Sequence, residues 1–351
     1  MKIGRLVACL VGSCLAAAAQ AAEPSFAGKT VRIVVNQAAG GPTDAFLRNF
    51  TRFFEAHIPG HPAIIVDNQS GAAGMIAANA IYNVAKPDGL TIGFMASITN
   101  DGLLGGPGVK FELTKFGLLA AIPSTQVTLV RHDTGAAAPR DLLHPKQPLN
   151  YAQYGGWVGV AGRLFLDMIG APYKYVTGYD GQAGTLLAIR TGEASVADAG
   201  AALYMPNADS WKREGLFDAL AQRGELGEDG NFHRSAMLPY LPTVAEAVAE
   251  LNPAALKTAQ FSAYHHTVGA NLGQYLIILP PRSDPDILRV LARATAEAFR
   301  DPQAIATAKE KLHLDYSFMD SAQATRFIGQ LQRDLEADPA GAEVMRTMIR
   351  Q

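Results

Sequence analysis

The chain has 351 residues, 48% of them hydrophobic, and its 32 acidic and 30 basic residues give a formal net charge of −2. This near balance gives no reason to expect a nucleic-acid-binding protein. The length favours two ordinary domains over one large one, and no apolar stretch after the first 21 residues is long enough to span a membrane.

The first 21 residues have the layout of a secretory signal peptide. Two basic residues precede an apolar run over residues 6–19, and Ala19 and Ala21 suit the small-residue positions of a cleavage site. A segment ending at Cys14 loosely resembles a lipoprotein box, although the apolar run continues past it. We expect cleavage after Ala21 and a periplasmic mature chain without cysteine, because Cys9 and Cys14 are the only two.

The N-terminal third alternates strand and helix signals. Residues 30–35 (TVRIVV) are β-branched and apolar and predict a strand, and the apolar residues between 46 and 54 recur at helical spacing. Further strands are predicted at 64–66 and 90–95, with a helix at 75–85 between them. Strand–helix–strand order with short connections indicates a parallel sheet that is covered on both faces.

The same pattern restarts in the middle of the chain. Strands predicted at 149–154, 173–176 and 195–199 alternate with helices at 160–169 and 186–191. This order indicates a second α/β unit.

Other segments connect these units. A strand at 125–131 leads out of the first unit into a loop at 135–148, and the polar stretch 207–235 is interpreted as a helix plus an exposed loop. A strong strand is predicted at 275–279 (YLIIL), followed by a helix at 284–299.

The C-terminal part is less regular. After the segment 305–312, a short strand is predicted at 314–318 and a final helix from Ser321.

Two glycine-rich turns, residues 40–44 (GGPTD) and 155–159 (GGWVG), each connect a predicted strand to a predicted helix. Glycine allows close approach of the backbone, and a helix N-terminus supplies free N–H groups and a positive dipole end, so both turns are candidate anion sites. Either turn alone could be only a tight connection. Neither matches a dinucleotide fingerprint or a P-loop.

Four segments together resemble the Bug family, the receptors of tripartite tricarboxylate transporters. They are residues 26–35 with the following GGPTD, 67–74 (DNQSGAAG), 86–92 (KPDGLTI) and 238–247 (LPYLPTVAEA), of which the last is the most specific. Their order and spacing fit nearly the whole mature chain, with the poorest match at 211–234 and 251–273.

The resemblance implies an α/β, two-domain, type II periplasmic-binding-protein fold, a Venus flytrap with two crossing strands as its hinge and a cleft between the domains. Residues 22–128 plus 272–351 are expected to form domain 1, and residues 129–271 domain 2. It further implies a monomeric receptor that needs no cofactor or metal. Such a receptor binds a small organic carboxylate and delivers it to the membrane components of the transporter.

The family's ligand loops correspond here to residues 37–44 and 154–158, where backbone N–H groups and bridging waters would hold a carboxylate. Asp44 is expected first to order its loop from the helix start, with ligand contact as the alternative. The full set of expected ligand contacts is Gln37, Ala38, Gly40, Gly41, Thr43, Asp44, Gly71, Ala72, Ser97, Thr99, Gly155, Gly156, Trp157, Val158, Tyr179, Asp180 and Asp198.

Three departures from the family pattern concern the ligand. Pro42 stands where a third glycine with an N–H is usual, Trp157 stands near a usual hydroxyl residue, and Asp180 replaces a lysine. An acidic group repels a second carboxylate, and an indole in the cleft favours a flat or apolar ligand body. These departures favour an aromatic or otherwise bulky carboxylate over citrate or malate, unless Trp157 packs as core.

Catalytic and metal chemistry find little support. No G-x-S-x-G motif occurs and no cysteine is expected to remain after cleavage, so the chain is not predicted to be an enzyme. His57 and His61 are separated by helix-breaking residues, which argues against zinc. His265 and His266, if in a strand, would point to opposite faces, so that at most one faces the cleft. A ligand-presenting sensor and a periplasmic enzyme on the same fold remain as alternatives.

Overall fold

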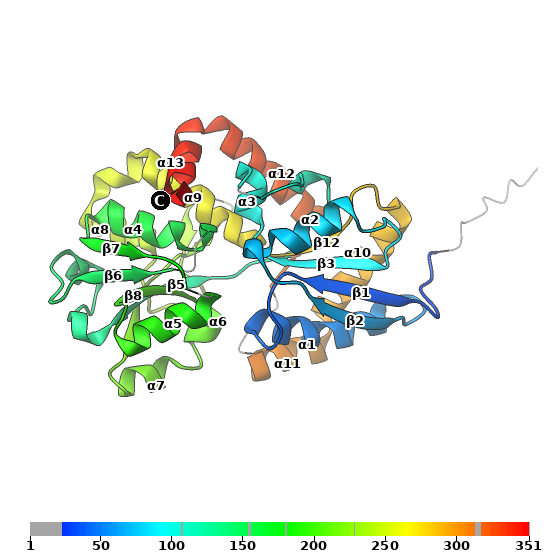
Figure 1. The fold of residues 1–351 in the computed structure, drawn as a ribbon, viewed down its shortest axis with the longest axis horizontal. Helices are drawn as coiled ribbons and strands as arrows, with labels where there is room; N and C mark the ends of the chain where they lie inside the picture. The colour runs from blue at the N-terminus through cyan, green and yellow to red at the C-terminus, as the bar shows by residue number, and fades with distance from the viewer. Residues whose placement is uncertain are drawn as a thin grey trace, which may run out of the picture.

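The computed structural model describes residues 23–106, 108–153, 156–179, 181–227, 229–312 and 317–350. The predicted signal peptide lies outside these residues. Figure 1 shows two lobes side by side, one mainly blue, cyan and orange and the other mainly green and yellow. Each lobe is built on its own sheet with helices around it, so the predicted α/β class with two sheets is confirmed.

The first lobe contains a six-stranded sheet in the order β13-β4-β12-β3-β1-β2. Its strands are β1 (Thr30–Val35), β2 (Ala63–Asn68), β3 (Thr91–Ala96), β4 (Gly117–Ile122), β12 (Tyr275–Leu279) and β13 (Met319–Asp320). Its helices are α1 (Pro42–His57), α2 (Met75–Asn83), α3 (Thr99–Leu104), α10 (Pro285–Arg300), α11 (Pro302–Thr307) and α12 (Ser321–Ala337). β1, β2 and β3 are parallel, as predicted, and β12 inserts antiparallel between β3 and β4.

Alternation along β1 explains why helices cover both faces of this sheet. Ile33 and Val35 point into the cluster formed with α1 and α10, whereas Val34 points into the cluster formed with α2 and α12. On the first face the rings of Phe50 and Phe299 lie with centroids 4.7 Å apart. The predicted helix from Ser321 is α12. Of the strand predicted at 314–318, residues 314–316 lie outside the described residues, and the observed β13 begins at Met319.

The second lobe contains a five-stranded sheet in the order β7-β6-β8-β5-β9. Its strands are β5 (Gln126–Arg131), β6 (Leu149–Ala152), β7 (Tyr173–Val176), β8 (Val196–Gly200) and β9 (Phe217–Gln222). The helices around it are α4 (Val160–Ile169), α5 (Gly181–Thr191), α6 (Ala201–Tyr204), α7 (Ala208–Arg213), α8 (Val244–Leu251), α9 (Ala259–Ala270) and α13 (Pro339–Arg350).

The prediction for residues 207–235 was wrong in part. After the short helix α7, β9 is a buried edge strand that pairs antiparallel with β5, and β10 (Glu225–Leu226) and β11 (Phe232–His233) form a small hairpin. The β9 sequence FDALAQ contains residues that are poor strand formers in isolation. Pairing with β5 and burial of Phe217 and Leu220 decide its conformation instead.

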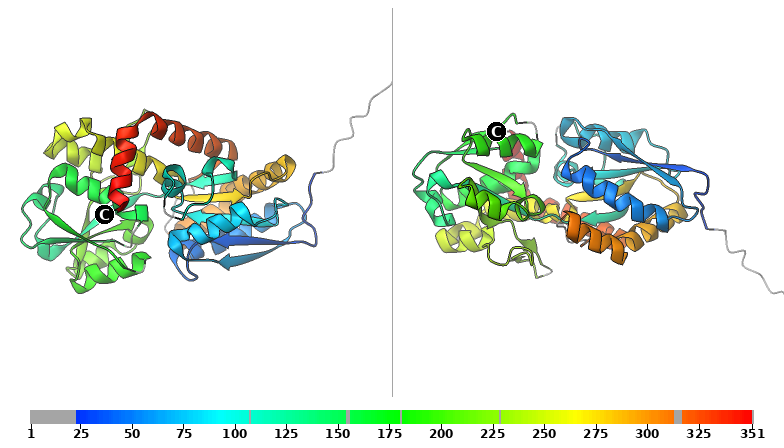
Figure 2. Two further views of the ribbon diagram at one scale, coloured as in Figure 1. Left: turned by 45° about the horizontal axis from the view of Figure 1, so that its top comes forward. Right: turned by 90° about the horizontal axis from the view of Figure 1, so that it is seen from below.

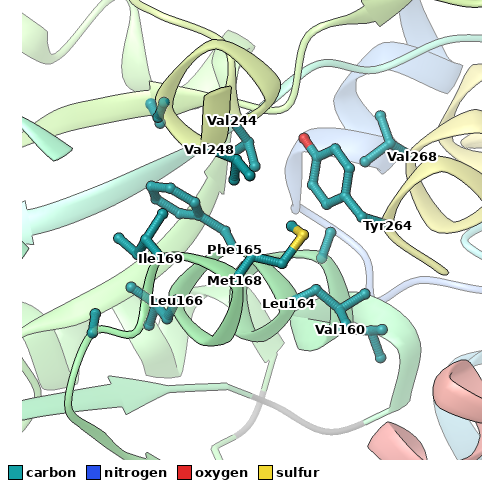
Figure 3. Packing of buried hydrophobic residues seen from close by; sticks show 14 of the residues in the cluster. Val160, Leu164, Phe165, Leu166, Met168, Ile169, Val244, Val248, Tyr264 and Val268 are labelled. Carbon is teal, nitrogen blue, oxygen red and sulfur yellow. The ribbon is translucent and has the colours of Figure 1, made fainter. Parts of the chain in front are cut away.

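The second lobe has one core where α4, α8 and α9 pack together and another around Trp211 and Phe217. Figure 3 shows Phe165 and Met168 of α4 on the side of Val244 and Val248 of α8, with Tyr264 of α9 completing the cluster. All of these side chains are buried. Their burial fixes the position of α4, whose N-terminal end reaches the space between the lobes.

Three segments join the lobes. The chain leaves β4 for β5, returns from α9 to β12, and crosses again between α12 and α13. Figure 2 shows α13, in red, lying over the second lobe, where Met345 and Met348 pack into the cluster of α4 and α9. The predicted division assigned residues 272–351 to the first domain, and this helix had not been expected to pack there.

The second connection is a helix and not the strand that was predicted. His265 and His266 therefore lie in α9, about 100° apart around the helix axis, and not on opposite faces of a strand. His266 Nε2 lies 2.9 Å from Asp338 Oδ2, and Ser262 donates a hydrogen bond to the same carboxylate. Asp338 also accepts a 3.0 Å bond from the N–H of Gly341. These contacts fix the bend between α12 and α13 to α9.

A buried polar cluster joins β5, β6, β8 and β9. Asp198 and Arg223, which are 4% and 1% exposed, form an ion pair inside the second lobe. Tyr151 donates to the same carboxylate, and Thr128 donates a 3.1 Å hydrogen bond to its other oxygen. Tyr264 of α9 donates a 2.7 Å bond to the carbonyl oxygen of Arg223. The cluster ties α9 to the strands beneath it.

We predict that Arg223→Met destabilises the protein by about 3–5 kcal/mol, because the buried Asp198 carboxylate loses its charge partner. Chemical denaturation at neutral pH measures the free energy of unfolding. The double variant Arg223→Met with Asp198→Asn should recover part of this loss, since no buried charge is then left alone. Equal stability of the wild type and the single variant would contradict the role assigned to the pair.

Candidate functional site

A cavity lies between the two lobes and is closed at one side by the segments that connect them. The empty space between these residues is about 400 Å³, open solvent at the mouth included. The first lobe contributes Ser97, Thr99 and Asn100, the second contributes Gln126, Trp157 and Ala161, and the connecting segment contributes Thr267, Ala270, Asn271, Gly273 and Gln274.

The turn after β3 is held firmly against the connecting segment. The N–H of Ser97 donates a 2.8 Å hydrogen bond to the carbonyl of Gln274, and the Gln274 side chain donates a 2.5 Å bond back to the Ser97 hydroxyl. Thr99 donates a 2.7 Å bond to the carbonyl of Gly273. Ser97 has a φ of 60°, an uncommon conformation for a residue with a side chain. The turn is therefore kept in a strained shape by its surroundings.

Two of the lining residues, from opposite lobes, each have a buried polar atom without a hydrogen-bond partner. These atoms are Oδ1 of Asn100 on α3 and Nε1 of Trp157, which precedes α4. The two residues are only 7% and 5% exposed. A buried donor or acceptor without a partner is costly, about 1–3 kcal/mol. A hydrogen bond from a ligand to either atom would remove this cost.

None of the residues that line the cavity is charged. An acidic residue directly follows one of them in the sequence. Asp101 follows Asn100, is 8% exposed, and forms no ion pair with any described residue. Burial raises the pKa of the Asp101 carboxyl to about 6, and the nearby indole N–H of Trp157 opposes that rise. That N–H lies outside regular hydrogen-bond geometry with the carboxylate. At neutral pH the corner beside Trp157 therefore carries negative charge.

The glycine-rich loop after β1 is ordered from within. Asp44, 3% exposed, accepts bonds of 3.0 Å from the N–H of Gly40, 2.8 Å from Arg48 and 3.0 Å from Asn68. The Arg48 bond, followed by those from Gly40 and Asn68, holds the pKa of Asp44 down at about 2. The N–H of Gly40 is thus already used. Pro42 is the first residue of α1, where its missing N–H removes no helical bond.

The loop after β2 is locked by close contact and strain. Asn36 exchanges two hydrogen bonds, of 2.9 and 2.8 Å, with the backbone of Ala96. A Cβ added at Gly74 would lie 2.1 Å from the Asn36 amide nitrogen, so only glycine fits there. Ala72 and Ala73 have φ values of 46° and 51°. Non-glycine residues held in this region are typical of functional loops.

Of the expected ligand contacts, Ser97, Thr99 and Trp157 line the cavity. The loop 37–44 and the residues Gly71 and Ala72 do not line it. Asp198 is directed into the second lobe, and the Tyr179 hydroxyl donates a 2.9 Å bond to Glu193.

Other expected contacts are only partly described. Gly155 and Asp180 lie outside the described residues, as does the side chain of Val158. Gly156 opens a short 3-10 turn that carries Trp157. The ligand-binding role of each expected residue stays a prediction.

Several lining residues had not been predicted. Asn100 and the segment 267–274 carry no motif that distinguishes them from ordinary polar positions. Asn100 follows Thr99 by one residue, so a search of the whole β3–α3 turn would have included it. Within the described part of the chain, no three His, Cys, Asp or Glu side chains are grouped to hold a metal ion, and no helix there is long and apolar enough to cross a bilayer.

Comparison with known proteins identifies a family and a fold. A family model described as tripartite tricarboxylate transporter family receptor matches residues 56–336. No curated protein matches the chain.

Solved structures give the fold. The periplasmic binding protein BugD is 18% identical over 91% of this chain and 97% of its own, with a TM-score of 0.63. MatC from Rhodopseudomonas palustris, solved with malate, is 20% identical over 90% of this chain and 98% of its own, with a TM-score of 0.62. A protein from R. palustris solved with adipate is 19% identical over 90% of this chain and 97% of its own, with a TM-score of 0.64. The predicted two-domain periplasmic-binding-protein fold is confirmed by this likeness.

We predict that Asp101→Asn changes the pH dependence of stability. The folded protein holds the Asp101 proton more tightly than the unfolded chain, so the stability this group contributes is full below pH 3.8 and is lost as pH rises through about 6. Between pH 4.5 and 7.5 the wild type should lose about 2 kcal/mol from this group, and the variant should not.

Chemical denaturation at the two pH values measures the difference, with Asp209→Asn on the exposed side of α7 as the matched substitution elsewhere. Parallel pH dependence of the wild type and Asp101→Asn would show that Asp101 is not buried as described.

Proposed function

The chain belongs to the receptor family of tripartite tricarboxylate transporters, and on that premise we propose that it is a periplasmic, monomeric receptor for a small organic carboxylate. It would bind the ligand in the cavity between its lobes and deliver it to the membrane components of such a transporter. The observation that carries this proposal is the cavity itself. Both lobes contribute a lining residue with an unpartnered hydrogen-bonding atom, which supports a ligand that bonds to both lobes at once.

Ligand-dependent closure follows from this arrangement. A ligand that bonds to Asn100 on one lobe and Trp157 on the other stabilises the state in which the lobes lie close together. Relatives solved with malate and with adipate support a carboxylate as the ligand class.

A receptor fits the cavity better than an enzyme. The hydroxyl of Thr99 donates to a backbone carbonyl, that of Thr267 donates 2.7 Å to the carbonyl of Ala263, and that of Ser97 accepts from Gln274. Within the described residues none of these hydroxyls contacts a histidine or carboxylate that could activate it as a nucleophile. The lining therefore has the chemistry of a binding site.

The structure gives little support to the aromatic ligand that was expected from Trp157. The indole is 5% exposed and packs in the core cluster of the second lobe. Little of its flat face is therefore open to the cavity. An uncharged hydrogen-bonding environment is thus the more direct property of this site.

We predict that the mature protein is stabilised by one or more compounds in a panel of mono-, di- and tricarboxylates. A ligand at about 100 times its dissociation constant should add about 2.7 kcal/mol of stability, which thermal unfolding detects. Ala161→Phe should abolish the effect, because the new ring fills the cavity from α4.

The matched control is Ala254→Phe, at an exposed alanine after α8. If no carboxylate stabilises the protein, or if Ala161→Phe keeps the full response, the cavity is not the site of carboxylate binding.

A further inference from the structure

We infer that the corner formed by Asn100, Asp101 and Trp157 selects ligands whose second polar group is uncharged. The ligand class is a carboxylate that carries, at its other end, a hydroxyl or a carboxamide in place of a second carboxylate. This inference rests on the proposed function, since it assumes that a carboxylate enters the cavity. It names the second group that the site recognises.

The first step concerns two atoms that make no regular hydrogen bond within the protein, although the Trp157 N–H lies near the Asp101 carboxylate. Trp157 Nε1 can only donate, so the ligand group must accept a hydrogen bond there. The side-chain carbonyl oxygen of Asn100 is unpartnered and can accept a hydrogen bond from a donor group of the ligand. A hydroxyl or a carboxamide supplies an acceptor and a donor together, whereas a carboxylate supplies acceptors alone.

The second step concerns charge. Asp101 is buried next to Asn100 in sequence, interacts with the indole of Trp157, and has no ion-pair partner among the described residues. No residue that lines the cavity is basic. A second carboxylate in this corner would meet a like charge in a poorly solvated place, where repulsion is stronger than in water. An uncharged group avoids that repulsion.

The first carboxylate has other partners in the same cavity. Gln126, Asn271 and Gln274 line it with amide groups, which can donate hydrogen bonds to an anion without carrying charge. One carboxylate can be bound in this way. Two would need a compensating cation, and the lining contains none.

Matched ligand pairs test the inference by calorimetry at pH 7.5 on the mature wild-type protein. The pairs are succinate with succinamate, glutarate with glutaramate, and adipate with adipamate, which differ only in the charge of one end. We expect the monoamide of the best-fitting pair to bind at least tenfold more tightly than its diacid.

Variants assign the discrimination to the corner. Asp101→Asn should reduce the ratio of the affinity for the monoamide to the affinity for the diacid, because the repelling charge is removed. Trp157→Phe should weaken binding of the monoamide by up to about tenfold, the effect of one hydrogen bond. It should weaken binding of the diacid less. Trp211→Phe, at the other tryptophan, which packs against Phe217 in the second lobe, is the matched control and should leave every affinity unchanged.

Several results would overturn the inference. Diacids that bind as tightly as their monoamides would do so, as would a ratio that stays the same in Asp101→Asn and Trp157→Phe. Binding of no member of any pair would also overturn it. In that event the carboxylate panel decides about the receptor itself: a stabilising carboxylate in the panel leaves the proposed function standing, and its absence ends both.

Discussion

Buried hydrogen-bonding groups without partners are the physical constraint on which the site depends. Elsewhere in the molecule, buried polar atoms such as those of Asn36, Asp44 and Asp198 are bonded within the protein, although Nε and Nη1 of Arg223 inside the second lobe also lack a hydrogen-bond partner. At the contact between the lobes, Asn100 and Trp157 each keep one atom unbonded. A protein rarely leaves such atoms without compensation. Asn100 and Trp157 come from opposite lobes and line one cavity, which supports this cavity as the proposed ligand site.

The surrounding structure keeps these atoms in place. The strained Ser97 turn is bonded to the connecting segment, and the loops after β1 and β2 are locked by Asp44 and Asn36. On the other lobe, α4 is fixed by the apolar core that it forms with α8 and α9. Rigid support on both sides would let the proposed closure of the lobes bring the two atoms to a ligand in a defined geometry.

The connections between the lobes are less simple than a pair of strands. One is helix α9, and the chain crosses a third time into α13, which packs on the second lobe. His266, Ser262 and Gly341 all bond to Asp338 at the bend between α12 and α13. Any hinge motion therefore has to act through segments that are packed against α9, and its amplitude is limited by them.

The sequence was most informative where a local rule decides the structure. Strong strands such as TVRIVV, the glycine turns and the family segments predicted the two α/β units and their order. It failed where distant contacts decide: β9 is a strand because it pairs with β5, and α9 is a helix whose faces pack on α4 and α13. Asn100 could not be singled out from the sequence, because no motif marks it. Its unpartnered oxygen is visible only in the folded structure.

The most direct test of the central claim is the indole N–H signal of Trp157 in a two-dimensional NMR spectrum of the ¹⁵N-labelled protein. The chain has only two tryptophans, so Trp211→Phe assigns the two indole signals without further work. On addition of a carboxylate that stabilises the protein, the Trp157 signal should move as its N–H gains a hydrogen bond, while the Trp211 signal stays in place. A Trp157 signal that does not move at saturation would contradict the account.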